Sequence, residues 1–312
     1  MKTAMKGILR FQKGSLKNWN NHDRKGIVML GIVDVGGGMR CVYSAGIYDC
    51  FLDNNIMIPC QVGVSAGSAN LITYACSQRG RTYEFYTDFA KRPEFMSMEN
   101  FRKTGSFIGL DYIYSDLSNT GGDSPLDYDA FVSSGVKLFV GATRAVDGEA
   151  HFFTNDDVKK DDYKILKASC CIPAVCKPYN IDGIDYYDGG IASPIPFQKA
   201  FDEGCDKVIV VLTKPRKDYL IPFGKKALTN IILHKTPSMI KQIQSLHTRC
   251  EVLLSEMEEL EKEGKLLVIE PKDCFGVDTL TRDSDKMGAL YDEGYEDAKS
   301  ALQTDFFDEL KV

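Results

Sequence analysis

The sequence has few histidines, no excess of positive charge and no long apolar run. Four of its 312 residues are histidine, and 44 Asp and Glu outnumber 38 Lys and Arg, for a net charge of -6. This balance argues against the broad electropositive surface that binds nucleic acid, so no nucleic-acid partner is expected. No stretch is long enough for a membrane-spanning helix, and the first 25 residues lack the continuous apolar run of a secretory signal, which predicts a cytoplasmic protein.

The cysteines give no sign of a metal site or of a disulfide scaffold. Ten are present in the chain, without a C-x-x-C pair and at a low density. Reduced thiols are the simplest interpretation. No loop has the spacing of an EF-hand, and neither a metal nor another cofactor is expected.

The first 25 residues form a basic N-terminal leader. Lys and Arg are frequent there, and Asp23 is the single acidic residue. Such an arm either contacts anionic lipid head groups at the inner membrane surface or stays solvated. The rest of the chain, residues 26–312, has no linker or repeat and is expected to be one domain.

Apolar runs followed by amphipathic segments predict a mostly parallel sheet. Continuous apolar runs at 26–33 and 58–64 each precede a helical pattern, at 42–52 and 68–77. Further strands are predicted at 136–142, 150–153, 207–212 and 266–269, with a hairpin turn at Asp147-Gly148. Residues 81–128 are interpreted as a helical excursion over the sheet. The expected fold is a single-domain, three-layer α/β/α structure.

A long helix is predicted between the start signal Thr236-Pro237 and the stop signal Gly264. Apolar residues recur along it at steps of three and four, and a run rich in glutamate near its end is expected to face water. We interpret this helix as scaffold.

A candidate nucleophile, Ser65, lies in Gly63-Val-Ser65-Ala-Gly67, between a predicted strand and a predicted helix. A sharp strand-to-helix turn of this kind needs small residues beside the serine, because backbone segments approach each other closely there. The following helix directs its N–H groups at the reacting centre. The alternative is a glycine-rich turn that only packs closely.

A second candidate segment, Asp34-Val-Gly36-Gly37-Gly38-Met39-Arg40, ends the first strand at the same edge of the sheet. Its glycines can turn backbone N–H groups toward an oxyanion. A phosphate-binding loop is the rival interpretation, although the spacing matches neither common phosphate-loop pattern. Arg40 either binds a phosphate head group or anchors the loop through a salt bridge.

A serine hydroxyl needs a base, and no histidine stands in a recognisable catalytic context. The candidate base is Asp188, which precedes Gly189 and Gly190 at a tight turn. Partial burial would raise its basicity toward neutral pH. The alternative for Asp188 is a residue that caps a β-turn.

These three segments, in this order and spacing, resemble the signature blocks of patatin-like phospholipases. A fourth stretch, Ala168-Ser169-Cys-Cys-Ile-Pro173, resembles another block of that family. The similarity runs from about residue 26 to residue 212 and points to a bacterial intracellular member. Many members have glycine directly after the basic residue of the glycine-rich block, where this chain has Cys41.

The resemblance implies a patatin-like acyl-hydrolase domain with a C-terminal helical part. It implies a Ser65–Asp188 dyad and an acyl-enzyme, with an oxyanion hole made by Gly36, Gly37, Gly38 and Met39. Arg40 and the glycines of the motifs (Gly63, Gly67, Gly189 and Gly190) would support the site. The expected substrate is a phospholipid, a lysophospholipid or a neutral acyl ester.

Two other functions stay open from the sequence. One is an α/β-hydrolase esterase with a Ser-Asp-His triad that uses His234 or His247. The other is a catalytically inactive module that binds a membrane or a protein. The segment 214–226 mixes basic and apolar residues and is either a peripheral membrane contact or a solvated loop.

Overall fold

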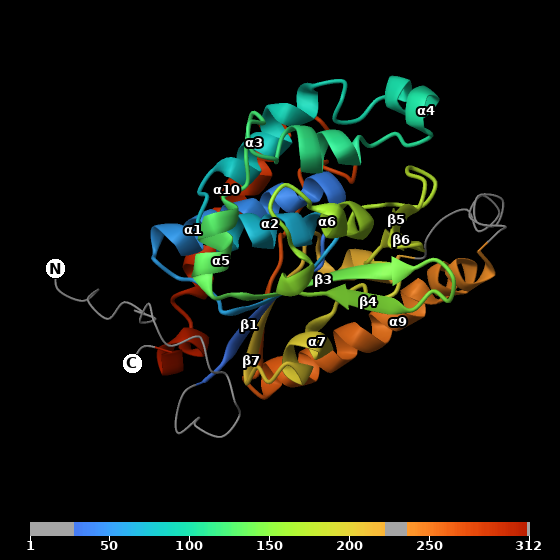
Figure 1. Cartoon of the computed structure of the whole chain (residues 1–312). Helices are drawn as coiled ribbons and strands as arrows, with labels where there is room; N and C mark the ends of the chain where they lie inside the picture. Colours follow the sequence, from blue (N-terminus) through green and yellow to red (C-terminus); the bar gives the residue numbers. More distant parts are fainter. Residues whose placement is uncertain (1–27, 222–235, 311–312) are drawn as a thin grey trace.

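A twisted eight-stranded sheet organises the computed structural model, which describes residues 28–221 and 236–310 (Figure 1). The strand order is β5-β6-β3-β2-β1-β7-β8, and β4 pairs with β3. The strands are β1 (Leu30–Asp34), β2 (Cys60–Val64), β3 (Lys137–Arg144), β4 (Ala150–Phe153), β5 (Tyr179–Ile181), β6 (Ile184–Asp188), β7 (Lys207–Val211) and β8 (Leu266–Ile269). Strands β3, β2, β1, β7 and β8 run parallel, and the predicted mostly parallel sheet is confirmed.

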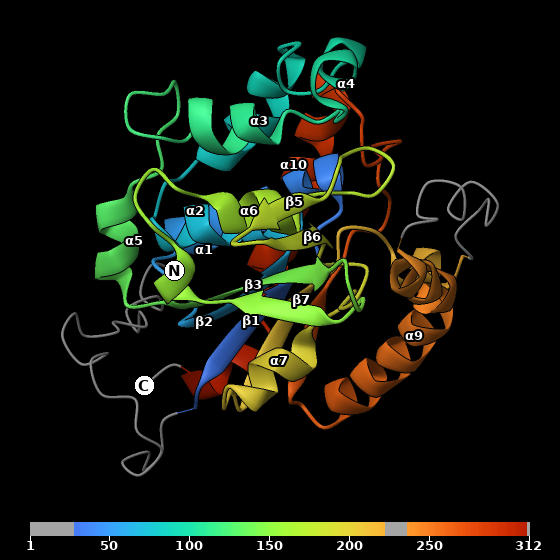
Figure 2. The same cartoon turned by 45° about the vertical axis from the view of Figure 1, so that its right-hand side comes forward.

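Helices cover both faces of the sheet (Figures 1 and 2). The α-helices are α1 (Val42–Asp53), α2 (Ala66–Ala75), α3 (Arg81–Thr87), α4 (Met98–Thr104), α5 (Tyr128–Ser134), α6 (Lys164–Ser169), α7 (Phe197–Asp202), α9 (Pro237–Lys262) and α10 (Ser284–Ala301). Short turns are η1 (Gly38–Cys41), η2 (Phe89–Lys91), η3 (Tyr112–Asp116), η4 (Asn155–Asp157), η5 (Arg216–Leu220) and η6 (Asp305–Leu310). Helices α1, α2, α6 and α10 lie on one face and α7 and α9 on the other, which confirms the three-layer architecture.

Two apolar cores, one on each side of the sheet, explain why the central strands are continuously apolar. Successive side chains of a strand point to opposite faces. In β1, Ile32 joins the core beneath α1 and α2, whereas Val33 joins the core against α7 and α9. In β7, Ile209 and Val210 divide in the same way. A central strand buried on both faces therefore has no polar side to alternate with.

The C-terminal ends of β2 and β6 meet along one edge of β3, and this register positions the candidate site. β2 pairs with β3 as far as Val64, opposite Gly141. The next residue of β3, Ala142, pairs with Asp188 at the end of antiparallel β6 and, across its other edge, with β4. Strands β2 and β6 thus occupy the same edge of β3 and point their ends at each other.

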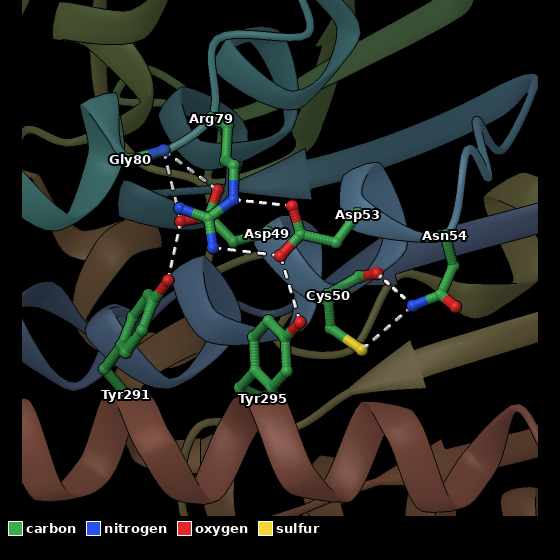
Figure 3. A network of polar contacts seen from close by, with 8 residues as sticks. All are labelled: Asp49, Cys50, Asp53, Asn54, Arg79, Gly80, Tyr291 and Tyr295. Atoms are coloured by element: carbon green, nitrogen blue, oxygen red, sulfur yellow. Dashed lines mark hydrogen bonds and ion pairs between the residues drawn. The ribbon is translucent and has the colours of Figure 1, made fainter.

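The C-terminal segment completes the sheet and one helical layer. β8 extends the sheet beyond β7, and α10 packs along α1. Figure 3 shows polar contacts at this interface: the hydroxyls of Tyr291 and Tyr295 donate to Asp49 and Asp53 on α1 at 2.8 and 2.9 Å. Arg79 donates to the same Asp53 from the end of the loop after α2.

The predicted elements are largely confirmed, with small shifts of their ends. The helix predicted from residue 68 begins at Ala66, because Ser65 is its N-terminal flanking residue. The long helix begins at Pro237, as predicted, and ends at Lys262. Residues 26–27, the basic leader and part of the 214–226 segment lie outside the described residues. Among the helices that the structure describes, none has the length and apolar character needed to cross a membrane.

We predict that Gly294→Ala destabilises the protein by about 1–3 kcal/mol, a typical cost of overpacking. A Cβ at position 294 would overlap the backbone carbonyl of Tyr43, because α1 and α10 pack backbone to backbone there. Urea denaturation measures the effect.

Gly288→Ala is the matched control on the same helix. A Cβ at position 288 would meet only the Tyr83 hydroxyl at 3.4 Å, so this variant should be neutral or up to about 1 kcal/mol more stable through helix propensity. Equal stability losses in the two variants would contradict the close-packing argument.

Candidate active site

Ser65 occupies a strained turn between β2 and α2. Its backbone angles are φ 54° and ψ -142°, a conformation that non-glycine residues rarely adopt. Its flanking glycines are required by space: a Cβ at Gly63 would lie 2.6 Å from the Ser68 Cα, and one at Gly67 would overlap Asp34. The predicted nucleophile elbow therefore has the expected strand-turn-helix context.

The backbone of Ser65 is held by Ser169, at the end of α6. The Ser65 N–H donates to the Ser169 hydroxyl at 2.8 Å, and that hydroxyl donates to the Gly141 carbonyl at 2.6 Å. Ser169 is fully buried, so this chain of hydrogen bonds is shielded from water. The sequence analysis quoted Ser169 only as part of a family block and assigned it no role.

Asp188, the candidate base, lies close enough to the Ser65 side chain for that side chain to lower its pKa. The Gly190 N–H donates to the Asp188 carboxylate at 2.9 Å. Burial raises the pKa of Asp188 to about 6, against the opposing effects of the Ser65 side chain and the Gly190 N–H. Gly189 must be glycine, because a Cβ there would overlap the Gly141 carbonyl. The two residues that the sequence analysis selected, 123 positions apart, therefore line the same cavity.

The glycine-rich loop lies directly against Ser65. Gly36, Gly37 and Gly38 have φ values of 73°, 138° and 62°, which favour glycine. A Cβ at Gly36 would be 2.8 Å from the Ser65 Cβ. The Thr213 hydroxyl, after β7, donates to the Gly36 carbonyl and fixes the loop.

The loop's N–H groups are not all free to bind an oxyanion. The Gly36 N–H donates to Asp34 at 3.0 Å, and the Met39 N–H donates to the Thr279 carbonyl at 3.2 Å. Within residues 28–221 and 236–310, the N–H groups of Gly37 and Gly38 meet no acceptor. Of the four residues expected from the sequence to donate an N–H to the oxyanion, Gly37 and Gly38 keep that N–H free, because those of Gly36 and Met39 are already bonded.

Asp34 is a buried carboxylate that supports the loop and was not selected from the sequence. Its carboxylate accepts the Gly36 N–H and, at 2.9 Å, the Tyr48 hydroxyl. Burial raises the pKa of Asp34 to about 6, although its hydrogen bonds oppose the shift. Its position at the carboxyl end of β1 was the available signal, since polar residues at this edge line ligand sites.

Arg40 anchors the loop through a hydrogen bond and not through the salt bridge considered above. Its Nη1 donates to the Thr279 hydroxyl at 3.2 Å, and a Cβ at Gly37 would lie 3.4 Å from its Nη2. No carboxylate in the described part of the chain forms an ion pair with Arg40. Its buried Nε has no hydrogen-bond partner.

Ser65 lies where two cavities adjoin. One, of about 90 Å³, is mainly apolar and extends beneath the 81–128 excursion, past Phe85, Phe95 and Ile113. The other, of about 500 Å³, is wider and mixed in character, and Asp188 lines it together with the glycine-rich loop. A molecule with an apolar chain on one side of a reacting carbonyl and a polar group on the other would match this arrangement.

The long helix α9, interpreted from the sequence as scaffold, also lines the wider cavity. Ile243, Leu246, His247 and Cys250 face it. The Nδ1 atom of His247 is buried without a partner, and His247 is not among the groups that shift the pKa of Asp188. His234, the other histidine of the triad alternative, lies outside the described residues.

Comparisons with known proteins give two family models and one curated relative. A family model described as patatin-like phospholipase matches residues 35–201, and one described as a domain of unknown function (DUF6363) matches residues 236–305. The uncharacterized protein YjjU of Escherichia coli (strain K12) is 28% identical over 198 residues, which are 62% of this chain and 54% of YjjU. The match thus spans about half the length of this curated relative.

Among solved structures, the chain is similar to the crystal structure of VipD from Legionella pneumophila. The TM-score is 0.43 at 13% identity, over 88% of this chain and 66% of VipD.

We predict that Ser169→Ala destabilises the protein by about 1–3 kcal/mol, because it leaves the buried Ser65 N–H without an acceptor. Turnover of an ester should fall with it, since the elbow loses its support. Chemical denaturation and ester hydrolysis measure the two effects.

Ser68→Ala is the control for this experiment. The Ser68 hydroxyl donates to the Ser65 carbonyl at 2.6 Å, but the Ser68 N–H donates to the same oxygen at 3.0 Å and remains in the variant. The expected loss is about 1 kcal/mol or less. If Ser169→Ala were the milder of the two, Ser169 would not be the support of the elbow.

Proposed function

The chain belongs to the patatin-like phospholipase family, whose model covers more than half of it, and we propose that it is a serine acyl-hydrolase of lipid esters. The single observation that carries the proposal is that Ser65 and the buried Asp188 carboxylate line one cavity with the glycine-rich loop, where the Ser65 side chain lowers the pKa of Asp188. A serine beside a base, at a strained turn, is the arrangement that nucleophilic catalysis requires.

In the proposed reaction Ser65 attacks the ester carbonyl while Asp188 accepts the hydroxyl proton. The negative charge that develops on the carbonyl oxygen is stabilised by the N–H groups of Gly37 and Gly38. The bond to the alcohol then breaks, and the protonated Asp188 returns its proton to the leaving oxygen. An acyl-enzyme on Ser65 remains.

Water completes the cycle in a second, similar step. Asp188 takes a proton from a water molecule, which attacks the acyl carbonyl; the bond to the Ser65 oxygen then breaks, Asp188 returns the proton to that oxygen, and a carboxylic acid is released. Burial supports this role for Asp188, because a pKa of about 6 makes the carboxylate a stronger base than an exposed aspartate while it stays ionised at pH 7.

The two cavities support a lipid ester as the substrate class. The narrow apolar cavity suits an acyl chain, and the wider cavity suits the alcohol half.

A cytoplasmic location agrees with ten cysteines that are all free thiols. A peripheral membrane contact agrees with the exposed side chains of Leu220 and Ile221, beside the wider cavity. The division into a basic leader and one domain stays a prediction.

We predict that Ser65→Ala abolishes both turnover of a p-nitrophenyl ester and labelling by a fluorophosphonate probe. Asp188→Asn should lower turnover by at least about 100-fold, since it removes the base but keeps the shape of the side chain.

Ser193→Ala is the control. Ser193 lies in the loop after Asp188 and lines neither cavity, so this variant should keep the labelling of the wild type. Full activity in a folded Ser65→Ala variant would exclude this serine as the nucleophile. Full activity in Asp188→Asn would exclude Asp188 as the base and favour the Ser-Asp-His triad.

We predict that kcat/KM rises with pH through an apparent pKa near 6, the value to which burial raises Asp188. The ionised form is the base, so activity is present above this pH and is lost about tenfold per pH unit below it. Asp34 titrates in the same range, and Asp34→Asn separates the two carboxylates. The inflection should persist in Asp34→Asn; its disappearance there would assign it to Asp34.

A further inference from the structure

The turn that follows Asp188 is anchored at its first two residues. The Asp188 N–H donates to the Cys171 carbonyl at 2.9 Å. The Gly189 N–H donates to the Ser169 carbonyl at 3.3 Å. Gly190 comes next, and its N–H is the group that donates to the Asp188 carboxylate. The direction of this N–H, and with it the orientation of the carboxylate, therefore also depends on what holds the chain after Gly190.

Two side chains hold the residues that follow. The buried Thr143 hydroxyl, on β3, accepts from the Ala192 N–H at 3.1 Å and donates to the Asp188 carbonyl at 2.7 Å. Arg249, on α9, donates from Nη1 to the Ala192 carbonyl at 2.7 Å and from Nη2 to the Ile191 carbonyl. Within the described part of the chain, no other donor bonds to these two carbonyls.

The Arg249 guanidinium is itself fixed in place by its own helix. Its Nε donates to the Ser245 hydroxyl at 3.3 Å, and Nη2 also donates to the Gln242 carbonyl at 2.9 Å. These acceptors and the two carbonyls of the turn are neutral oxygens, and burial lowers the pKa of Arg249. Its bonds to the turn are charge-assisted, and such bonds are about twice as strong as those between neutral groups.

The shape of the guanidinium suits this contact. Its planar fork presents several N–H donors in a fixed geometry, so it can bond two successive carbonyls at once, whereas an ammonium is a compact point charge. Helix α9 lies on the face of the sheet that α7 also covers (Figure 2), and it belongs to the segment 236–305 that the second family model matches. This segment therefore reaches the turn of the candidate base through Arg249.

From these contacts we infer that Arg249 is a positioning residue for the reaction: it holds the turn after Asp188 so that the Gly190 N–H stays directed at the carboxylate of the base. This inference rests on the proposed function. Arg249 lines neither of the cavities beside Ser65, so it acts through the turn and not through contact with the substrate. It is also not among the charges that shift the pKa of Asp188.

The test measures kcat and KM for a p-nitrophenyl ester with the full chain carrying Arg249→Ala. We expect kcat to fall by about 10- to 100-fold, since a small misplacement of a catalytic group can cost about 100-fold in rate. KM should stay near the wild-type value, because the side chain lines neither cavity. Arg249→Lys keeps the charge without the fork, so its kcat should also fall. Circular dichroism checks that each variant is folded.

Ser238→Ala is the matched control, because Ser238 also ties α9 to backbone carbonyls, but at the turn after β3. Its hydroxyl donates to the carbonyls of Ala145 and Val146 at 3.1 and 3.3 Å. This variant should keep the kcat of the wild type. Equal falls in Ser238→Ala and Arg249→Ala would assign the effect to the attachment of α9 as a whole and overturn the inference.

Added guanidinium ion distinguishes positioning of the turn from a general loss of structure. At millimolar, non-denaturing concentrations it should partly restore the kcat of Arg249→Ala, because it can fill the vacated space and bond both carbonyls. Methylammonium has the charge without the fork and should not restore kcat. Equal recovery with the two cations, or no recovery with either, would contradict the inference.

Wild-type kcat in a folded Arg249→Ala variant would overturn the inference while leaving the acyl-hydrolase proposal intact. If Arg249→Ala does not fold, Arg249→Lys carries the test, and wild-type kcat in that variant has the same meaning. If the wild-type protein cleaves no ester and no fluorophosphonate labels it, the proposed function itself fails and the inference with it.

Discussion

The proximity of Ser65 and Asp188, which line one cavity, depends on how two strands end against a third. Parallel β2 and antiparallel β6 share one edge of β3, with Val64 opposite Gly141 and Asp188 opposite Ala142. A shift of either strand by one residue would turn its side chains to the other face of the sheet. The register of β3 therefore fixes the distance between the hydroxyl and the carboxylate.

Close backbone packing around this point explains the glycines. Three glycines lie closer to neighbouring backbone than a Cβ permits: Gly36 of the loop meets the Val64 carbonyl, Gly63 in β2 meets the Ser68 Cα, and Gly189 after β6 meets the Gly141 carbonyl. The same packing excludes water, and burial raises the pKa values of both Asp34 and Asp188. Exclusion of water thus supplies basicity at the dyad, while hydrogen bonds from Tyr48 and from backbone N–H groups keep Asp34 in place.

The C-terminal segment has two roles in this arrangement. Helix α10 packs backbone to backbone against α1 through Gly46 and Gly294, and α1 in turn follows the glycine-rich loop. Thr279, in the connection before α10, binds both the Met39 N–H and the Arg40 side chain. Residues matched by the second family model, 236–305, therefore both stabilise the loop and line the wider cavity.

The sequence by itself determined the local features: the alternation of strands and helices, the turn at Ser65, the glycines of the loop and the carboxylate at the Asp188 turn. These could be predicted because each depends on neighbours a few residues away, through apolar periodicity or through a turn that needs small residues. The β5–β6 hairpin and the role of Ser169 could not, since short strands and single hydroxyls carry little signal of their own.

Only the tertiary structure decided that the Met39 N–H is not free, because it is bonded to the carbonyl of Thr279, which is 240 positions away along the chain. It also decided that helix α9, expected to be scaffold, contributes residues such as His247 to the lining of the wider cavity. Contacts between residues more than 30 positions apart depend on how whole elements pack, and no local pattern in the sequence encodes that packing.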